Sequence, residues 1–161
     1  MRHRSRRQFL SVVFLALWLQ AAPAFCQQLT VQTESGRPTV LARADIEALP
    51  HTKVTTGAST TFEGVSLKAV LEKAGVEFGE TLKGKRLASY LLVEAADGYR
   101  VVIALPELDP AFTDKQVILA FLKDGKPLDE KEGPYRVVIP DEKRMARWVR
   151  QVTKLRIVDV Q

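Results

Sequence analysis

Sulfur and imidazole ligands are scarce in this chain of 161 residues, which has one cysteine and two histidines. A single cysteine cannot form an internal disulfide, and no CxxC pair or Cys/His cluster offers the ligands of a structural zinc site. His3 stands at the extreme N-terminus, so His51 is the one histidine in the body of the chain. One histidine cannot make a His-rich metal site, and we expect His51 to form a structural hydrogen bond.

Several nucleotide and hydrolase motifs are absent as well. The sequence contains no GxGxxG or GxxxxGK[ST] loop for phosphate, and no HExxH or GxSxG motif. No sequence motif therefore indicates a nucleotide-binding protein, a zinc hydrolase or a serine hydrolase. Apolar residues make up 46% of the chain and charged residues 27%, which excludes wholesale disorder. The length suits one domain.

The first 26 residues are typical of a secretory signal peptide. Four arginines and no acidic residue open the chain, and an apolar run follows from Phe9 to Leu19. The stretch Ser5–Leu10 resembles the twin-arginine export motif; the alternative is an ordinary secretion signal that carries two arginines. We expect residues 1–26 to be a signal peptide, and residues 27–161 to form an exported, periplasmic domain without a transmembrane segment. Cys26 stands at the edge of that domain or is removed with the signal.

The net charge of the whole chain is +5, but most of it belongs to the N-terminal arginines. Without residues 1–26, 20 basic side chains face 19 acidic ones, so the remaining domain is almost neutral. General binding to nucleic acid requires a basic surface, and we do not expect it here.

Strand-like segments outnumber helical segments in the remaining chain. Ser66 is in position to cap a helix that Gly75 ends. Because strands and helices do not alternate regularly, the pattern predicts an α+β domain with a mixed or antiparallel sheet and short helices. The predicted helices cover residues 44–49 and 67–74, with a single turn at 106–108, and the predicted strands cover 28–33, 40–41, 51–56, 88–95, 99–104, 116–122, 135–140 and 152–159.

Basic residues gather near the C-terminus, where residues 135–156 carry seven of them against two acidic residues. If the chain turns helically after Pro140, Arg144 and Arg147 share a face. Clustered guanidinium groups suit a phosphate or another oxyanion, whereas the alternative is a solvated basic surface. The seven are Arg136, Lys143, Arg144, Arg147, Arg150, Lys154 and Arg156.

Five segments together resemble the small molybdopterin-binding domain of the sulfite-oxidase-type oxidoreductases. They occur in the order of that family and with about its spacings. The resemblance implies a mixed α+β fold and a molybdopterin cofactor, and the use of the twin-arginine route by this family agrees with the N-terminal motif. The segments are Phe62–Leu67, Asp97–Pro106, Asp124–Leu128, Gly133–Pro140 and Lys143–Trp148.

The resemblance also implies site residues. Arg136 occupies the position of an arginine near the pterin phosphate, and Arg147 matches a basic residue in the loop that wraps the pterin. Tyr99 belongs to a turn that lines the metal side of the pocket in this family. The positions implied to bind the anionic cofactor are Tyr99, Arg136, Lys143, Arg144 and Arg147.

One departure from the family concerns the metal. The family holds molybdenum with a cysteine thiolate in a loop that corresponds to Thr55–Thr61, and that loop contains no cysteine here. We therefore expect binding of a pterin or another anion without standard thiolate–molybdenum catalysis, and we assign no catalytic residue. The alternatives are a non-catalytic binding or interaction module and a structural domain without ligand. Electron transfer would require a partner, such as a membrane redox or sensor protein, because no haem or iron–sulfur motif is present.

Overall fold

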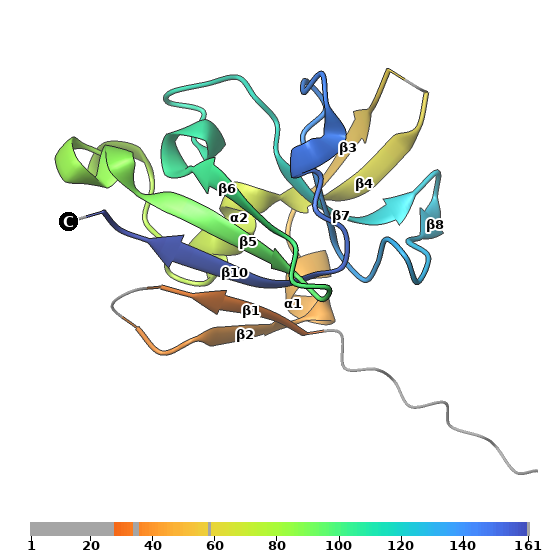
Figure 1. Cartoon of the computed structure of the whole chain (residues 1–161), viewed down its shortest axis with the longest axis horizontal. Coiled ribbons are helices and arrows are strands. Elements are labelled where there is room, and N and C mark those ends of the chain that lie inside the picture. Colours follow the sequence, from red (N-terminus) through yellow and green to blue (C-terminus); the bar gives the residue numbers. More distant parts are fainter. Residues whose placement is uncertain (1–27, 34–35, 58, 161) are drawn as a thin grey trace, which may run out of the picture.

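The structure is a computed structural model that describes residues 28–33, 36–57 and 59–160. The predicted signal peptide, residues 1–26, lies outside this range. Two β-sheets make up most of the domain: one crosses the lower part of the view in Figure 1, and the other lies at the upper right. Their buried side chains form one continuous hydrophobic core.

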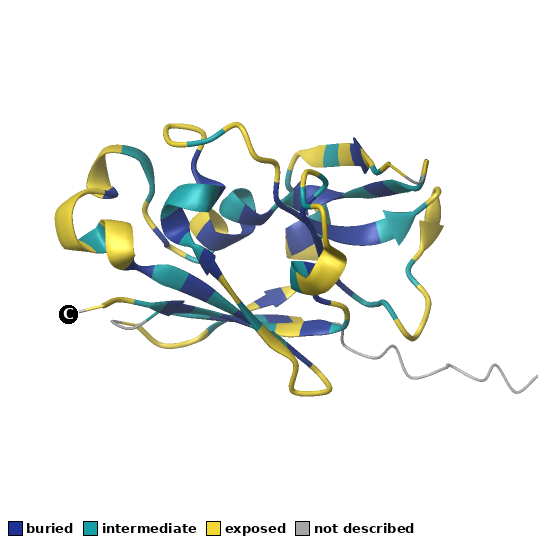
Figure 2. Cartoon of the chain, turned by 45° about the horizontal axis from the view of Figure 1, so that its top comes forward, coloured by how far each residue is buried: buried dark blue, intermediate teal, exposed yellow. Residues whose placement is uncertain are grey.

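The first sheet has five strands in the order β2-β1-β10-β5-β6. The central β10 runs parallel to β1, and every other neighbouring pair is antiparallel. Buried and more exposed residues alternate along β1 and β5, so that one face of the sheet covers the core; Figure 2 shows the alternation as bands of dark blue and lighter colours. The bounds are β1 Gln28–Gln32, β2 Thr39–Ala42, β5 Tyr90–Ala95, β6 Arg100–Ala104 and β10 Val152–Val158.

The second sheet is antiparallel throughout. Its strand β7 pairs with β4, β8 and β9, and four consecutive residues from Ile118 are buried. Such a run is typical of a strand that is covered on both faces. The bounds are β3 His51–Thr55, β4 Thr61–Ser66, β7 Ile118–Lys123, β8 Lys126–Pro127 and β9 Arg136–Val138.

The helices are short. Helix α1 (Arg43–Glu47) contacts β2 of the first sheet and β4 of the second. Helix α2 (Leu67–Lys73) is capped by Ala74 and followed by Gly75, whose φ of 91° is a left-handed conformation that glycine adopts without strain. Among the residues that the structure describes, we find no candidate for a membrane-spanning helix. The described residues also form four 3₁₀ turns: η1 Gly79–Thr81, η2 Gly84–Ala88, η3 Leu105–Leu108 and η4 Met145–Arg147.

The predicted α+β fold with mixed strands and short helices is confirmed. Strand β4 was not predicted from the sequence; its consecutive residues Gly64 and Val65 are both buried and interrupt the alternation along the strand. Ser66 does precede helix α2 as predicted, but its side chain makes no capping hydrogen bond.

Strand β4 passes very close to strand β7 at Gly64. The register between the two strands shifts between Glu63 and Gly64, which marks a β-bulge. A Cβ atom on Gly64 would lie 2.6 Å from Ala120 Cα and would also collide with the Leu119 carbonyl. Because these are backbone atoms of a central strand, they cannot move aside easily.

We predict that Gly64→Ala lowers the free energy of unfolding by about 2–3 kcal/mol, the usual cost of overpacking. Gly57→Ala is the matched control, because nothing lies within 4 Å of a Cβ atom there. Urea denaturation of both variants measures the difference. Equal stability of the two variants would show that β4 and β7 are not so closely packed.

His51 makes the structural hydrogen bonds that were predicted for it. Its Nδ1 lies 3.0 Å from Glu63 Oε1, and its Nε2 lies 3.0 Å from the Glu47 carbonyl oxygen. Both partners are acceptors, so both bonds form only when the imidazole carries two protons. The hydrogen bond with Glu63 and the one with Glu47 raise the pKa of His51.

This arrangement predicts a pH dependence of stability. Because the pKa of His51 is raised by folding, its contribution is complete below the unfolded value of about 6.5 and is lost as the pH rises through the folded value. An NMR titration of the His51 ring should give a pKa above 6.5 that falls in Glu63→Gln. An unchanged pKa in that variant would contradict the pairing.

Candidate functional site

The structure distributes the predicted basic residues over three environments. Arg136 is buried in strand β9, whereas Arg147 is held by two carboxylates outside the core. Lys143 and Arg144 are exposed and have no hydrogen-bond or ion-pair partner among the described residues. The basic segment therefore does not form one cluster of arginines.

Arg136 is one of only two charged residues that are buried in the described part of the chain. Its guanidinium forms an ion pair with Glu132, four residues earlier. The guanidinium carbon lies 5.3 Å from the centre of the Phe62 ring and 5.6 Å from that of Trp148. These distances allow cation–π attraction to both rings.

The charge of Arg136 is only partly compensated. Burial lowers the pKa of Arg136, the carboxylate of Glu132 raises it, and the nearby Arg150 guanidinium lowers it again, so that the net direction is downward. The Nε atom is buried and has no hydrogen-bond partner among the described residues. An additional acceptor beside Arg136 would therefore be favourable.

Arg136 and Arg150 line the same surface hollow, which has a volume of about 350 Å³. One wall comes from the hairpin between β5 and β6 and the other from the chain around η4. The Tyr99 hydroxyl donates a hydrogen bond of 2.6 Å to the Ala146 carbonyl and so joins the two walls. The lining residues are Ala95, Asp97, Tyr99, Glu132, Arg136, Met145, Ala146, Trp148 and Arg150.

Trp148 fixes the floor of this hollow. Its indole Nε1 donates a buried hydrogen bond of 2.9 Å to the Ile139 carbonyl, which orients the ring. The ring of Phe62 meets it edge-on, with the ring centres 6.0 Å apart. The aromatic surface is thus held in place before any ligand arrives.

Arg147 is bound to carboxylates of its own domain. Its Nε donates to Glu142 at 2.6 Å, and its two Nη atoms donate to the carboxylate of Glu107 at 3.3 and 3.2 Å. The hydrogen bond with Glu107 raises the pKa of Arg147 against the effect of burial, and Glu142 raises it further. This guanidinium joins η4 to η3 and does not line the hollow.

Arg144 and Arg147 do not share a helical face. The turn η4 has only three residues, and Arg144 precedes it in an extended conformation (φ −129°, ψ 130°). The condition for the shared face, a helix after Pro140, is therefore not met. Arg150 was counted among the basic residues of the sequence without a role, and Glu132 was not identified as part of a site. Asp97 belongs to the turn that the family resemblance placed along the pocket, and it does line the hollow.

A metal site is not evident in the described residues. They contain no group of three or more His, Cys, Asp and Glu side chains that could hold a metal ion. The loop that joins β3 to β4 closes on itself: Thr56 N–H donates to the Thr60 carbonyl at 3.0 Å, and Ser59 N–H donates to the Thr56 carbonyl at 2.9 Å. Cys26 lies outside the described residues.

Comparison with known proteins identifies the family. The profile of the oxidoreductase molybdopterin binding domain matches residues 42–161. The fold is similar to the crystal structure of the sulfane dehydrogenase SoxCD from Paracoccus pantotrophus, with a TM-score of 0.64 and 22% identity. That match covers 83% of this chain and 38% of the other, so this chain spans well under half of that protein. A search of curated proteins gave no significant match. The chain belongs to the oxidoreductase molybdopterin binding domain family.

Proposed function

We propose that this domain binds an anionic pterin cofactor of the molybdopterin type in the hollow between the β5–β6 hairpin and η4. The observation that carries the proposal is the pair of guanidinium groups, Arg136 and Arg150, which line one hollow and disfavour each other electrostatically. A ligand that accepts hydrogen bonds between them relieves that repulsion. Membership in the family supports this choice of ligand.

The residues of the hollow fit a flat, polar heterocycle. Its volume of about 350 Å³ is within the range of small-molecule sites. Tyr99 and Trp148 offer aromatic surface to the ring of a ligand, and Arg150 offers a planar set of donors. The Arg136 ion pair and the Trp148 hydrogen bond hold the inner wall rigid, which reduces the entropy lost on binding.

The protein's own contribution is to bind and orient the pterin. When bound with its metal, a molybdopterin cofactor supplies redox chemistry that side chains alone cannot supply. The described residues offer no thiolate and no cluster of metal ligands. This observation favours a second candidate function, a non-catalytic binding or interaction module that keeps the fold of the family.

We also propose that the domain works after export to the periplasm. The support is the sequence of residues 1–26, with its four arginines, apolar run and twin-arginine-like motif. A membrane redox or sensor protein would be a suitable partner there, because the chain carries no haem or iron–sulfur motif of its own.

The test is to measure pterin and molybdenum in the full chain purified from a host that makes molybdopterin. Pterin is measured by fluorescence after oxidation and denaturation, and molybdenum by mass spectrometry. We expect about one pterin per chain, and a loss of roughly tenfold or more in Arg150→Ala, because hydrogen bonds to charged groups contribute strongly.

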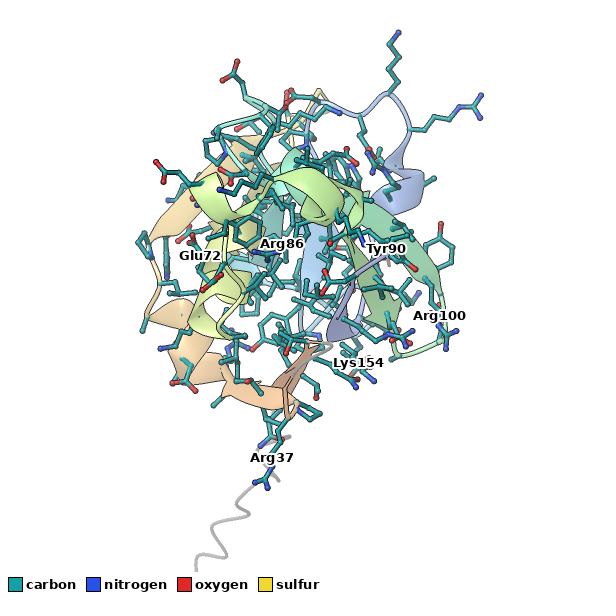
Figure 3. All side chains as sticks on the ribbon, turned by 90° about the vertical axis from the view of Figure 1, so that its left-hand side faces the viewer. Arg37, Glu72, Arg86, Tyr90, Arg100 and Lys154 are labelled. Atoms are coloured by element: carbon teal, nitrogen blue, oxygen red, sulfur yellow. The ribbon has the colours of Figure 1, made fainter. Side chains whose placement is uncertain are left out.

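Arg37→Ala is the matched control. Arg37 is exposed, and Figure 3 shows its side chain pointing away from the domain; the pterin content of this variant should equal that of the wild type. Wild-type protein without pterin, or with equal pterin content in Arg150→Ala, would overturn the proposal. Stoichiometric molybdenum together with pterin would contradict the non-catalytic alternative.

A further inference from the structure

The first sheet covers the core with one face only. In the views of Figures 1 and 2, the helices and the second sheet lie on the same side of it. Along β5, Leu91 and Val93 are buried on this inner side, whereas Leu92 and Glu94 are half exposed on the other. The outer face of the sheet is thus left open by the elements that the structure describes.

Charged side chains form a row across this outer face. Glu94 on β5 stands opposite Arg100 on β6 and Lys154 on β10, and Figure 3 shows the two cations toward the lower right of the view. The Glu94 Oε2 atom lies 3.1 Å from Arg100 Nε, and its Oε1 atom lies 3.7 Å from Arg156 Nε. Lys154 has no ion-pair partner among the described residues.

The outer face therefore has an excess of positive charge. Strands β5, β6 and β10 contribute three cations and one carboxylate to it, a net charge of +2. The carboxylate of Glu94 is already shared by two arginines, so the charge of Lys154 remains available to a group from outside the domain.

Apolar side chains lie beside the charged row. Leu92 stands opposite Val102 on β6, and Tyr90, one row further along β5, stands opposite Val158 on β10. Val102 is 48% exposed although it lies within a strand. An exposed apolar patch that is bordered by charged residues is typical of an interaction site.

The hairpin between β5 and β6 connects this face to the hollow. Ala95 and Tyr99 line the hollow, whereas their neighbours in the chain, Glu94 and Arg100, belong to the charged row. A molecule docked on the outer face therefore lies against the hairpin that forms one wall of the hollow.

We infer that the outer face of β10, β5 and β6 docks a partner protein whose surface is acidic around an apolar centre. A carboxylate of this partner pairs with Lys154, and its apolar side chains cover Leu92 and Val102. Such electrostatic complementarity makes an interface specific and speeds the encounter of the two proteins. The inference does not depend on which ligand the hollow binds.

Charge argues against two occupants that this chain itself could supply. A second copy would bring the same excess of positive charge to the face. Residues 1–26 carry four arginines and no acidic residue, so they share its sign as well. Neither of them complements the face, whereas an acidic partner does.

A lipid surface also fits less well than a protein. The apolar row adjoins Glu94, so Leu92 and Val102 enter hydrocarbon only together with an ionised carboxylate. Such a charge is costly in lipid. In a protein interface, the same carboxylate keeps its two arginine partners.

The experiment is site-specific photo-crosslinking of the full chain in its native host, with p-benzoylphenylalanine in place of Val102. The control position is Phe112, which is equally exposed, at 49%, but lies in the loop between η3 and β7. The crosslinked protein is then purified, and its affinity for wild type, Lys154→Gln and Lys126→Gln is measured by calorimetry. Lys126, on β8 of the second sheet, is exposed and has no ion-pair partner among the described residues.

We expect one acidic protein to crosslink at position 102 and not at position 112. Its affinity should fall with rising salt, and Lys154→Gln should weaken it roughly fivefold or more, because an interfacial ion pair is lost. Lys126→Gln should bind as the wild type does. Because no ion pair within the domain is broken, both variants should melt at the wild-type temperature.

Several results would overturn the inference. They are a crosslink to a second copy of the chain, no crosslink at position 102, and equal affinities of Lys154→Gln and Lys126→Gln for the crosslinked protein. Co-sedimentation with vesicles of equal parts phosphatidylglycerol and phosphatidylcholine, if lost in Lys154→Gln, would assign the face to a membrane instead. The pterin content of the chain is a separate measurement, so the proposed function stands or fails independently.

Discussion

The Arg136 guanidinium is buried between the rings of Phe62 and Trp148, where it has lost most of its water. Removing the partner of such a buried charge costs about 3–5 kcal/mol, so Glu132 has to remain in place. The carboxylate of Glu132 also binds Lys123 at the end of β7. The chain that leads into β9 is thereby fixed to the centre of the second sheet.

The surroundings of Arg136 also connect the two sheets. Backbone hydrogen bonds join Val137 N–H to the Val149 carbonyl at 2.8 Å and Val152 N–H to the Tyr135 carbonyl at 2.9 Å. The chain after Trp148 is therefore tied to β9 before it enters the first sheet as β10. Arg150 lies in this segment between Trp148 and β10. The packing around the buried Arg136 therefore also positions Arg150, which lines the hollow with it.

Local sequence patterns were enough for most strands and for the two helices, because alternation and helical spacing depend on near neighbours. They were not enough for β4, whose Gly64 is explained only by its close approach to the backbone of Leu119 and Ala120 on β7. Of the site, the sequence indicated Arg136 and Tyr99, which do line the hollow. It did not indicate Glu132 as a lining residue, since only the folded chain brings the β5–β6 hairpin and the loop before β9 together.

The same limit applies to the charge count of the C-terminal segment. Three of its seven cations, Arg136, Arg147 and Arg156, are paired with carboxylates, and most of those carboxylates come from outside residues 135–156. The local excess of five positive charges in the sequence is therefore partly neutralised in the folded domain. The cations that remain unpaired decide what the surface can bind. One of them, Arg150, lines the same hollow as the buried Arg136, so the folded chain brings together two guanidinium groups that are 14 residues apart in the sequence.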